Sequence, residues 1–407
     1  MTIGRRICHR APELILACLA SLTFLGCLGS PEVWGKREQR AVAETLDTVE
    51  HGNWLVAQIQ GRKRLEKPPL PRWMIATLVV VTGQLDEWVF RLPGGLSALG
   101  MVALTYSFGK RIASRSVGLA AGLALTSTAS FISETRQAGN DAPLAFFVTL
   151  ALYAAFRRLE HGGKSQEGER EHSGEISQDG GRFWVWAMYA ALGCGFLTKG
   201  PIAVLLVLVA VIPYLAIAGC LKTGMRRLWN GRALVLFLFM AACWPIPVLF
   251  QDPGAASVWY LEMIQKTASM GIKHRQGREI LALNWPGFTA PWLVLGGLGV
   301  LLPFRMEKCS RQSQIWLVWW WAVGNLALFC FWKVAKPNYY LPCLPAVALL
   351  VGLQWVRLTQ LARELGRSGL LARITLQGHW VSLFSLGVIG PVIAWKLFPG
   401  LAMGATF

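Results

Sequence analysis

Long apolar runs recur along the whole chain, and they constrain its fold more than any other feature. A helix needs roughly 20 apolar residues to cross a bilayer. About eleven runs approach this length, at residues 14–30, 96–108, 117–132, 142–156, 183–197, 201–221, 233–250, 288–303, 315–331, 340–356 and 380–398. Because backbone polar groups in hydrocarbon must be satisfied within their own segment, runs of this kind favour helices over barrel strands. We therefore expect an all-α, polytopic membrane protein of about eleven transmembrane helices.

Basic residues between the runs give the chain a formal net charge of +18. If the N-terminus is cytoplasmic, every short inside segment is basic, as the positive-inside rule requires. These segments carry Arg5, Arg6 and Arg10, then Lys110, Arg111 and Arg115, then residues 157–182, then Lys222, Arg226, Arg227 and Arg232, then Arg305, Lys308 and Arg311, and finally residues 357–373. Anionic lipid headgroups account for this surplus better than nucleic acid does. We expect membrane lipids as partners, and no nucleic acid.

The longest polar interval between the first two runs covers residues 31–93, and on this topology it is the first outer loop. Val42, Leu46 and Val49 have helical spacing, which predicts an amphipathic helix on the membrane surface. Pro68, Pro69 and Pro71 then hold the neighbouring segment extended, and a second surface helix is expected at residues 72–81. We expect a solvated cytoplasmic loop at residues 159–182, one membrane-embedded domain over residues 1–407, and no C-terminal soluble domain.

Charged residues at the loops and span ends meet on this outer side, and each has a functional and an ordinary interpretation. Lys67 on its rigid turn can hold an anionic headgroup, or it can be a lysine that snorkels at a helix end. Arg40 can supply a planar fork to the same phosphate, or it can pair with Glu44 one turn further along. Asp141 begins an apolar run, where an acid is often only a helix cap or dipole partner.

Three more outer segments carry similar candidates. Lys199 lies between two apolar runs, where a lysine is costly unless it meets water or an anion. His274 stands in a long outer loop with no second His or Cys at metal spacing, so no metal site is predicted there. Lys336 precedes Tyr339 in K-P-N-Y-Y, which an interfacial aromatic belt also explains. The convergence of these groups on one membrane face predicts a shared polar cavity.

These residues also stand in motifs that resemble a known family. In chain order they are an E-x-R at Glu38–Arg40, E-K-P-P-L at residues 66–70 with Trp73, R-L-P at 91–93, T-R-Q-A-G-N-D at 135–141, F-L-T-K-G-P at 196–201, H-R-Q at 274–276 and K-P-N-Y-Y-L-P at 336–342. The order and spacing resemble the GT-C glycosyltransferases that use polyprenyl-phosphate sugars. Within them the chain is similar to the bacterial branch of lipid A aminoarabinose transferases and protein O-mannosyltransferase relatives.

The resemblance implies an activity, a location and a set of site residues. A sugar would pass with inversion from polyprenyl phosphate, such as undecaprenyl phosphate, to a lipid, glycan or protein acceptor at the periplasmic face of the bacterial inner membrane. Lys67, Arg40 and Tyr339 would bind the donor phosphate. The implied cavity lining is Glu66, Arg136, Asp141, Lys199, His274 and Lys336.

The sequence departs from the family at the first outer loop. Where members commonly carry an Asp-Glu pair, this chain has Arg37-Glu38. The general base is then Glu38 or Asp141, or the acceptor is already ionised and needs none, or the protein is catalytically altered. No cofactor is indicated, and the need for a divalent metal is left open. The alternative function is that of a lipid or solute transporter or flippase. Transporters typically carry charges near the middle of their spans and have duplicated halves, and neither feature is evident in this sequence.

Overall fold

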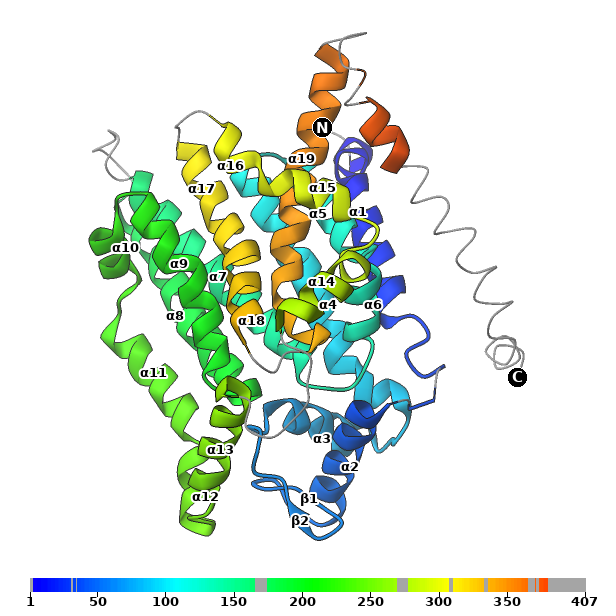
Figure 1. The fold of residues 1–407 in the computed structure, drawn as a ribbon, viewed down its shortest axis with the longest axis vertical. Coiled ribbons are helices and arrows are strands. Elements are labelled where there is room, and N and C mark those ends of the chain that lie inside the picture. Colours follow the sequence, from blue (N-terminus) through cyan, green and yellow to red (C-terminus); the bar gives the residue numbers. More distant parts are fainter. Residues whose placement is uncertain are drawn as a thin grey trace.

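A computed structural model describes residues 3–30, 32–33, 35–164, 174–268, 277–306, 310–332, 336–364, 370 and 373–379. The described chain is almost entirely helical (Figure 1). Its helices in the first part of the chain are α1 (Ile3–Leu25), α2 (Lys36–Glu50), α3 (Leu70–Thr82), α4 (Glu87–Ile112), α5 (Arg115–Thr126), α6 (Ala129–Thr135), α7 (Asp141–Lys164), α8 (Gly174–Lys199) and α9 (Ile202–Ile217). These are followed by α10 (Leu221–Leu228), α11 (Gly231–Ala242), α12 (Pro245–Gln251), α13 (Ala255–Ala268), α14 (Gly277–Phe288), α15 (Leu293–Val300), α16 (Leu302–Arg305), α17 (Ser310–Trp319), the π-helix η1 (Trp320–Gly324), α18 (Asn325–Phe331), the 3₁₀-helix η2 (Pro337–Cys343) and α19 (Leu344–Glu364).

The expected all-α membrane architecture is confirmed. Within the described residues, five helical segments are long and apolar enough to cross a membrane, at Glu87–Ile112, Asp141–Glu160, Gly231–Gln251, Gln314–Phe331 and Pro337–Glu364. The pair of α5 and α6, which bend by 63° at their junction, makes a sixth only if the two helices form one broken span and not a re-entrant loop. The apolar runs at 14–30, 183–197, 201–221 and 288–303 fall largely on the helices α1, α8, α9 and α14–α16. The run at 380–398 lies outside the described residues.

The bundle is organised around α4, α5, α7 and α19. Helix α7 packs against α8, while α5 packs against both α4 and α19. Phe108 stacks on Phe156 at 4.7 Å between ring centroids and lies 5.9 Å from Trp321, so α4, α7 and η1 meet in one apolar core. Helices α5 and α19 approach closely at Gly352, where a Cβ would lie 2.8 Å from the backbone oxygen of Val117.

The interval after α1 folds against one end of this bundle, as Figure 1 shows for α2, α3 and the hairpin of β1 (Gln58–Ile59) and β2 (Arg62–Lys63). The two expected surface helices are confirmed as α2 and α3. The hairpin turns through Gln60 and Gly61, both with positive φ, which suits a tight two-residue loop. Ile75 and Val79 of α3 pack with Val89 of α4, which fixes the loop on the bundle.

Helices extend into two of the expected loops. Helix α4 begins at Glu87, inside the expected loop of residues 31–93, and its Arg91 is only 3% exposed. The expected cytoplasmic loop at residues 159–182 is largely helical where it is described, since α7 continues to Lys164 and α8 begins at Gly174.

Candidate active site

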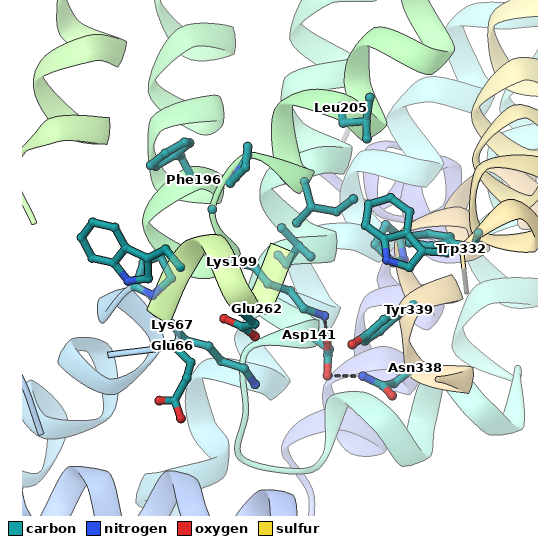
Figure 2. A pocket seen from close by; sticks show the side chains of 18 of the residues that line it. Glu66, Lys67, Asp141, Phe196, Lys199, Leu205, Glu262, Trp332, Asn338 and Tyr339 are labelled. Carbon is teal, nitrogen blue, oxygen red and sulfur yellow. Dashed lines mark hydrogen bonds and ion pairs between the residues drawn. The ribbon is translucent and has the colours of Figure 1, made fainter. Parts of the chain in front are cut away.

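A cavity of about 620 Å³ opens between the first loop and the end of the bundle. Its walls come from the turn before α3, the first turns of α7, the α8–α9 junction, α12, α13, α18 and η2 (Figure 2). The lining residues are Glu66, Lys67, Pro68, Asp141, Leu144, Phe196, Lys199, Gly200, Pro201, Ile202, Leu205, Trp244, Pro245, Trp259, Glu262, Phe329, Trp332, Asn338, Tyr339 and Pro342. Most are apolar or aromatic, and the charged ones gather around Asp141.

Asp141 is the hub of the polar end. It is the first residue of α7, where a carboxylate is favoured by the helix dipole. Its Oδ1 accepts a hydrogen bond from Lys199 Nζ at 2.6 Å. Its Oδ2 accepts from Asn338 Nδ2 at 2.5 Å and from Arg37 Nη1 at 3.1 Å. Four elements distant in sequence, α2, α7, α8 and η2, therefore meet at one carboxylate.

Lys199 is placed by the way α8 ends. It is the last residue of α8, and Gly200 follows with φ +76°, a left-handed conformation that terminates helices. Pro201 then directs the chain into α9. The ammonium also lies 4.2 Å from the ring centroid of Tyr339, so a cation–π contact accompanies its pair with Asp141.

Lys67 is presented by a braced segment between the hairpin and α3. Arg72 and the Trp73 indole both donate to the carbonyl of Trp54 at 2.7 Å. Trp259 of α13 donates to the carbonyl of Leu65, also at 2.7 Å. In Figure 2 the Lys67 ammonium points toward Asp141, so two lysines from distant segments flank the same carboxylate.

The structure brings together five of the residues that the sequence predicted for this site. Glu66, Lys67, Asp141, Lys199 and Tyr339 all line the cavity. Their chemical roles remain predictions.

Glu38 lies in a buried ion pair and does not line the cavity, and its role as a base stays a prediction. Its side chain is only 2% exposed, and its Oε1 and Oε2 accept from Arg91 at 2.7 and 3.1 Å. Oε1 also accepts from the backbone N–H of Ala138 at 3.0 Å. The Glu38 carboxylate does not line the cavity. Its ion pair with Arg91 joins α2 to α4.

Three other predicted residues also lie away from the cavity lining, and one is outside the described chain. Arg40 is exposed on α2. Arg136 donates to the carbonyls of Thr23 and Cys27, so it ties α6 to the end of α1. Lys336 is exposed beside η2 and does not line the cavity. His274 falls outside the described residues.

Sequence reasoning missed several lining residues. Asn338 was within the K-P-N-Y-Y motif, but only its contact with Asp141 reveals its part in the site. Glu262 is a lone acid on α13, and nothing local marks it as facing a cavity. Trp244 and Trp259, whose ring centroids are 5.5 Å apart, carry no local signal that separates them from the other tryptophans of the chain.

Arg37 occupies the solvent side of Asp141. Its Nη1 lies 2.8 Å from Glu134 Oε2 and 3.1 Å from Asp141 Oδ2, and its Nη2 donates to Gln137 at 3.3 Å. Burial lowers the pKa of the Arg37 guanidinium, but the ion pairs with Glu134 and Asp141 outweigh it and raise that pKa above its ordinary value. Arg37 is therefore a permanent cation at this position.

A family model described as dolichyl-phosphate-mannose-protein mannosyltransferase matches residues 35–246, more than half of the chain. The chain belongs to this mannosyltransferase family. The matched region contains Lys67, Asp141 and Lys199, so the family model spans most of the polar end of the cavity. The sequence resemblance to GT-C glycosyltransferases is thereby confirmed.

Curated relatives of this mannosyltransferase-family protein carry a more specific name. The undecaprenyl phosphate-alpha-4-amino-4-deoxy-L-arabinose arabinosyl transferase 1 of Pseudomonas fluorescens is 26% identical over 343 residues, which cover 84% of this chain and 58% of that protein. The corresponding transferase of Pseudomonas aeruginosa is 25% identical over 368 residues, covering 87% of this chain and 61% of that one. The chain thus spans about 60% of the length of these relatives.

Solved structures share the fold of this family member. ArnT from Cupriavidus metallidurans bound to undecaprenyl phosphate matches with a TM-score of 0.74 and 20% identity, covering 90% of this chain and 63% of that one. The oligosaccharyltransferase of Archaeoglobus fulgidus in complex with Zn and sulfate matches with a TM-score of 0.57 and 12% identity, covering 92% of this chain and 52% of that one. These similarities establish the fold of the chain.

Proposed function

We propose that this protein transfers a sugar, with inversion, from a polyprenyl phosphate such as undecaprenyl phosphate to an acceptor. One observation carries the proposal: an apolar cavity of about 620 Å³ ends at a cluster in which Lys67 and Lys199 flank Asp141. The names of the curated relatives, which act on an undecaprenyl-phosphate-linked aminoarabinose, support the same donor class.

The two lysines suit the leaving group of this reaction. As the glycosidic bond breaks, negative charge grows on the lipid phosphate. Preplaced cations in a poorly hydrated site stabilise that charge more than cations in water do. The Lys199 side chain is held by Asp141 and Tyr339, and the backbone that carries Lys67 is braced by Trp259, so the two cations are presented before the donor binds.

The apolar wall suits the lipid part of the donor. Ile202, Leu205, Phe329 and Trp332 line the cavity beside Lys199 and Tyr339. Isoprenoid units are apolar, and ligand sites for such groups are lined mainly by aliphatic and aromatic side chains with a few polar anchors. The phosphate is then the anchor, and the first isoprene units occupy the aromatic wall.

A general base for an acceptor hydroxyl is available at Glu66. Its Oε1 accepts from Arg64 at 2.8 Å, whereas its buried Oε2 has no hydrogen-bond partner among the described residues. Asp141 already accepts from three side chains, which suits it to orienting Lys199. If the acceptor is already ionised, neither Glu66 nor Asp141 is needed as a base. The variants Glu66→Gln and Asp141→Asn distinguish a base at Glu66, a base at Asp141 and a reaction without a base.

We place the cavity on the periplasmic face of the bacterial inner membrane, where a lipid, glycan or protein acceptor reaches it. The opposite end of the bundle carries the basic helix α10, which the positive-inside rule assigns to the cytoplasm.

The test uses purified protein in proteoliposomes that contain lipid A as the acceptor, with radiolabelled undecaprenyl-phosphate sugars as donors, aminoarabinose first and mannose second. The measured quantity is the release of free undecaprenyl phosphate. Lys67→Ala should reduce release by on the order of 10²–10³-fold, the usual cost of removing one transition-state charge partner. Lys63→Ala, an exposed lysine paired with Asp252 outside the cavity, is the matched control and should retain release.

Undiminished release by Lys67→Ala would contradict the phosphate-binding role. Movement of the labelled lipid across the bilayer without any release would instead identify a transporter or flippase.

A further inference from the structure

The contacts of Arg37 bear on whether a metal takes part at this site. Glu134 and Asp141 face each other across a narrow gap, with 16% and 10% of their side chains exposed. Two carboxylates in this arrangement offer the oxygen ligands that hard divalent cations prefer. One solved structural relative, the Archaeoglobus fulgidus oligosaccharyltransferase, was crystallised with Zn.

The residues present do not fit such a cation. The Nη1 atom of Arg37 stands between the carboxylates, 2.8 Å from Glu134 Oε2 and 3.1 Å from Asp141 Oδ2. The other Asp141 oxygen already accepts from Lys199 at 2.6 Å. In the part of the chain that the structure describes, no group of three or more His, Cys, Asp or Glu side chains is arranged to hold a metal. A divalent ion would have to displace the guanidinium of Arg37 and approach the ammonium of Lys199.

We propose that Arg37 is a built-in cation that replaces a bridging divalent metal between Glu134 and Asp141. Its guanidinium neutralises both carboxylates and fixes α2 of the first loop to α6 and α7. The catalytic consequence is that sugar transfer proceeds without added metal. This consequence rests on the proposed transferase function. The guanidinium also excludes divalent cations from the site by charge repulsion.

The inference predicts that removing Arg37 uncovers a metal site. Purified protein in nanodiscs is titrated with Mn²⁺, and bound ion is measured by electron paramagnetic resonance. Arg37→Ala should bind one Mn²⁺ on the order of tenfold or more tightly than wild type, since a unit charge has left the site. Arg37→Lys, which keeps the cation, should behave as wild type. Lys36→Ala removes a neighbouring exposed cation of α2 and should gain no site.

Adding Glu134→Gln to Arg37→Ala should abolish the gained Mn²⁺ site, because one of its two ligands is lost. If Arg37→Ala fails to fold, Arg37→Gln removes the charge while retaining a hydrogen-bonding side chain. A wild-type protein that binds one Mn²⁺ as tightly as Arg37→Ala overturns the proposal, as does an Arg37 variant that gains no binding.

A second arm measures undecaprenyl phosphate release by wild type with and without EDTA. Equal release supports a metal-independent reaction, and loss that Mn²⁺ restores contradicts it. If no release occurs under any condition, the proposed function fails, whereas the Mn²⁺ titration still decides the part played by Arg37.

Discussion

Glu38 and Arg91 form a buried ion pair beside the site, outside the cavity lining. Glu38 and Arg91 are 2% and 4% exposed at their side chains and make two hydrogen bonds to each other. Arg91 also donates to the carbonyls of Leu28 and Glu32. The end of α1, the start of α2 and the first turns of α4 are therefore joined at one guanidinium.

Breaking this pair should destabilise the protein while sparing its chemistry. Glu38→Gln leaves Arg91 buried with an uncompensated charge, which costs about 3–5 kcal/mol in comparable buried pairs. We expect a lower Tm in a thermal-shift measurement, and an unchanged rate of lipid phosphate release per folded molecule. The double variant Glu38→Met with Arg91→Met should recover part of the loss, because neither charge remains. A stable Glu38→Gln protein that has lost release would restore Glu38 as a base candidate.

The polar hub was only partly predictable at this scale. Lys67 and Lys199 could be identified because a lysine near the membrane is costly unless it meets water or an anion. Asp141 could be identified because it begins an apolar run. The pairing of Glu38 with Arg91, 53 residues away, depends on how α2 folds back against α4. No spacing within either segment specifies that contact, so sequence alone left Glu38 among the base candidates.

At the scale of elements, helix periodicity predicted the first surface helix, the second was expected after the proline segment, and the apolar runs predicted most of the bundle. The bend of 63° between α5 and α6 was not anticipated, since residues 117–132 were treated as one apolar run although T-S-T interrupts it at residues 126–128. The bend places Ser130 against the carbonyl of Phe288 and Trp292 against Ser127, so contacts with α14 and its following turn stabilise it. Such tertiary contacts override a local pattern.

The close packing of α5 on α19 gives an element-scale prediction. At Gly352 a Cβ would lie 2.8 Å from both the Ala121 nitrogen and the Val117 oxygen, which are backbone atoms that cannot rotate away. Gly352→Ala should force the helices apart and cost about 1–3 kcal/mol, the usual range for overpacking. Gly297→Ala is the control, because Gly297 is also helical but has nothing within 4 Å of its Cβ position.

Helical glycine-to-alanine changes gain roughly 0.5–1 kcal/mol when there is space. Gly297→Ala should therefore leave the Tm unchanged or raise it, and Gly352→Ala should lower it, both measured in the same detergent. Equal Tm values for the two variants would mean that α5 and α19 are less tightly packed than their backbones indicate.

Across the whole molecule, the cavity exists only because distant segments converge on one end of the bundle. Trp244 and Trp259 of the α12–α13 region donate to the carbonyls of Leu55 and Leu65 in the first loop, at 2.8 and 2.7 Å. These contacts bridge 189 and 194 residues of sequence. The sequence predicted a shared cavity from the sidedness of the charges, while the aromatic residues that close it could be identified only from the fold.

This arrangement predicts opposite membrane exposure for the two ends of the molecule. Helix α2 lies at the cavity end, and α10 at the other (Figure 1). Lys36 on α2 and Lys222 on α10 are both exposed. In a background with the nine native cysteines replaced, Lys36→Cys and Lys222→Cys are expressed in a bacterial inner membrane and treated with a membrane-impermeant thiol reagent. Lys36→Cys should react in spheroplasts, and Lys222→Cys only after lysis, because basic inside segments are retained in the cytoplasm. If Lys222→Cys reacted in spheroplasts and Lys36→Cys only after lysis, the cavity would face the cytoplasm. That result would exclude transfer at the periplasmic face.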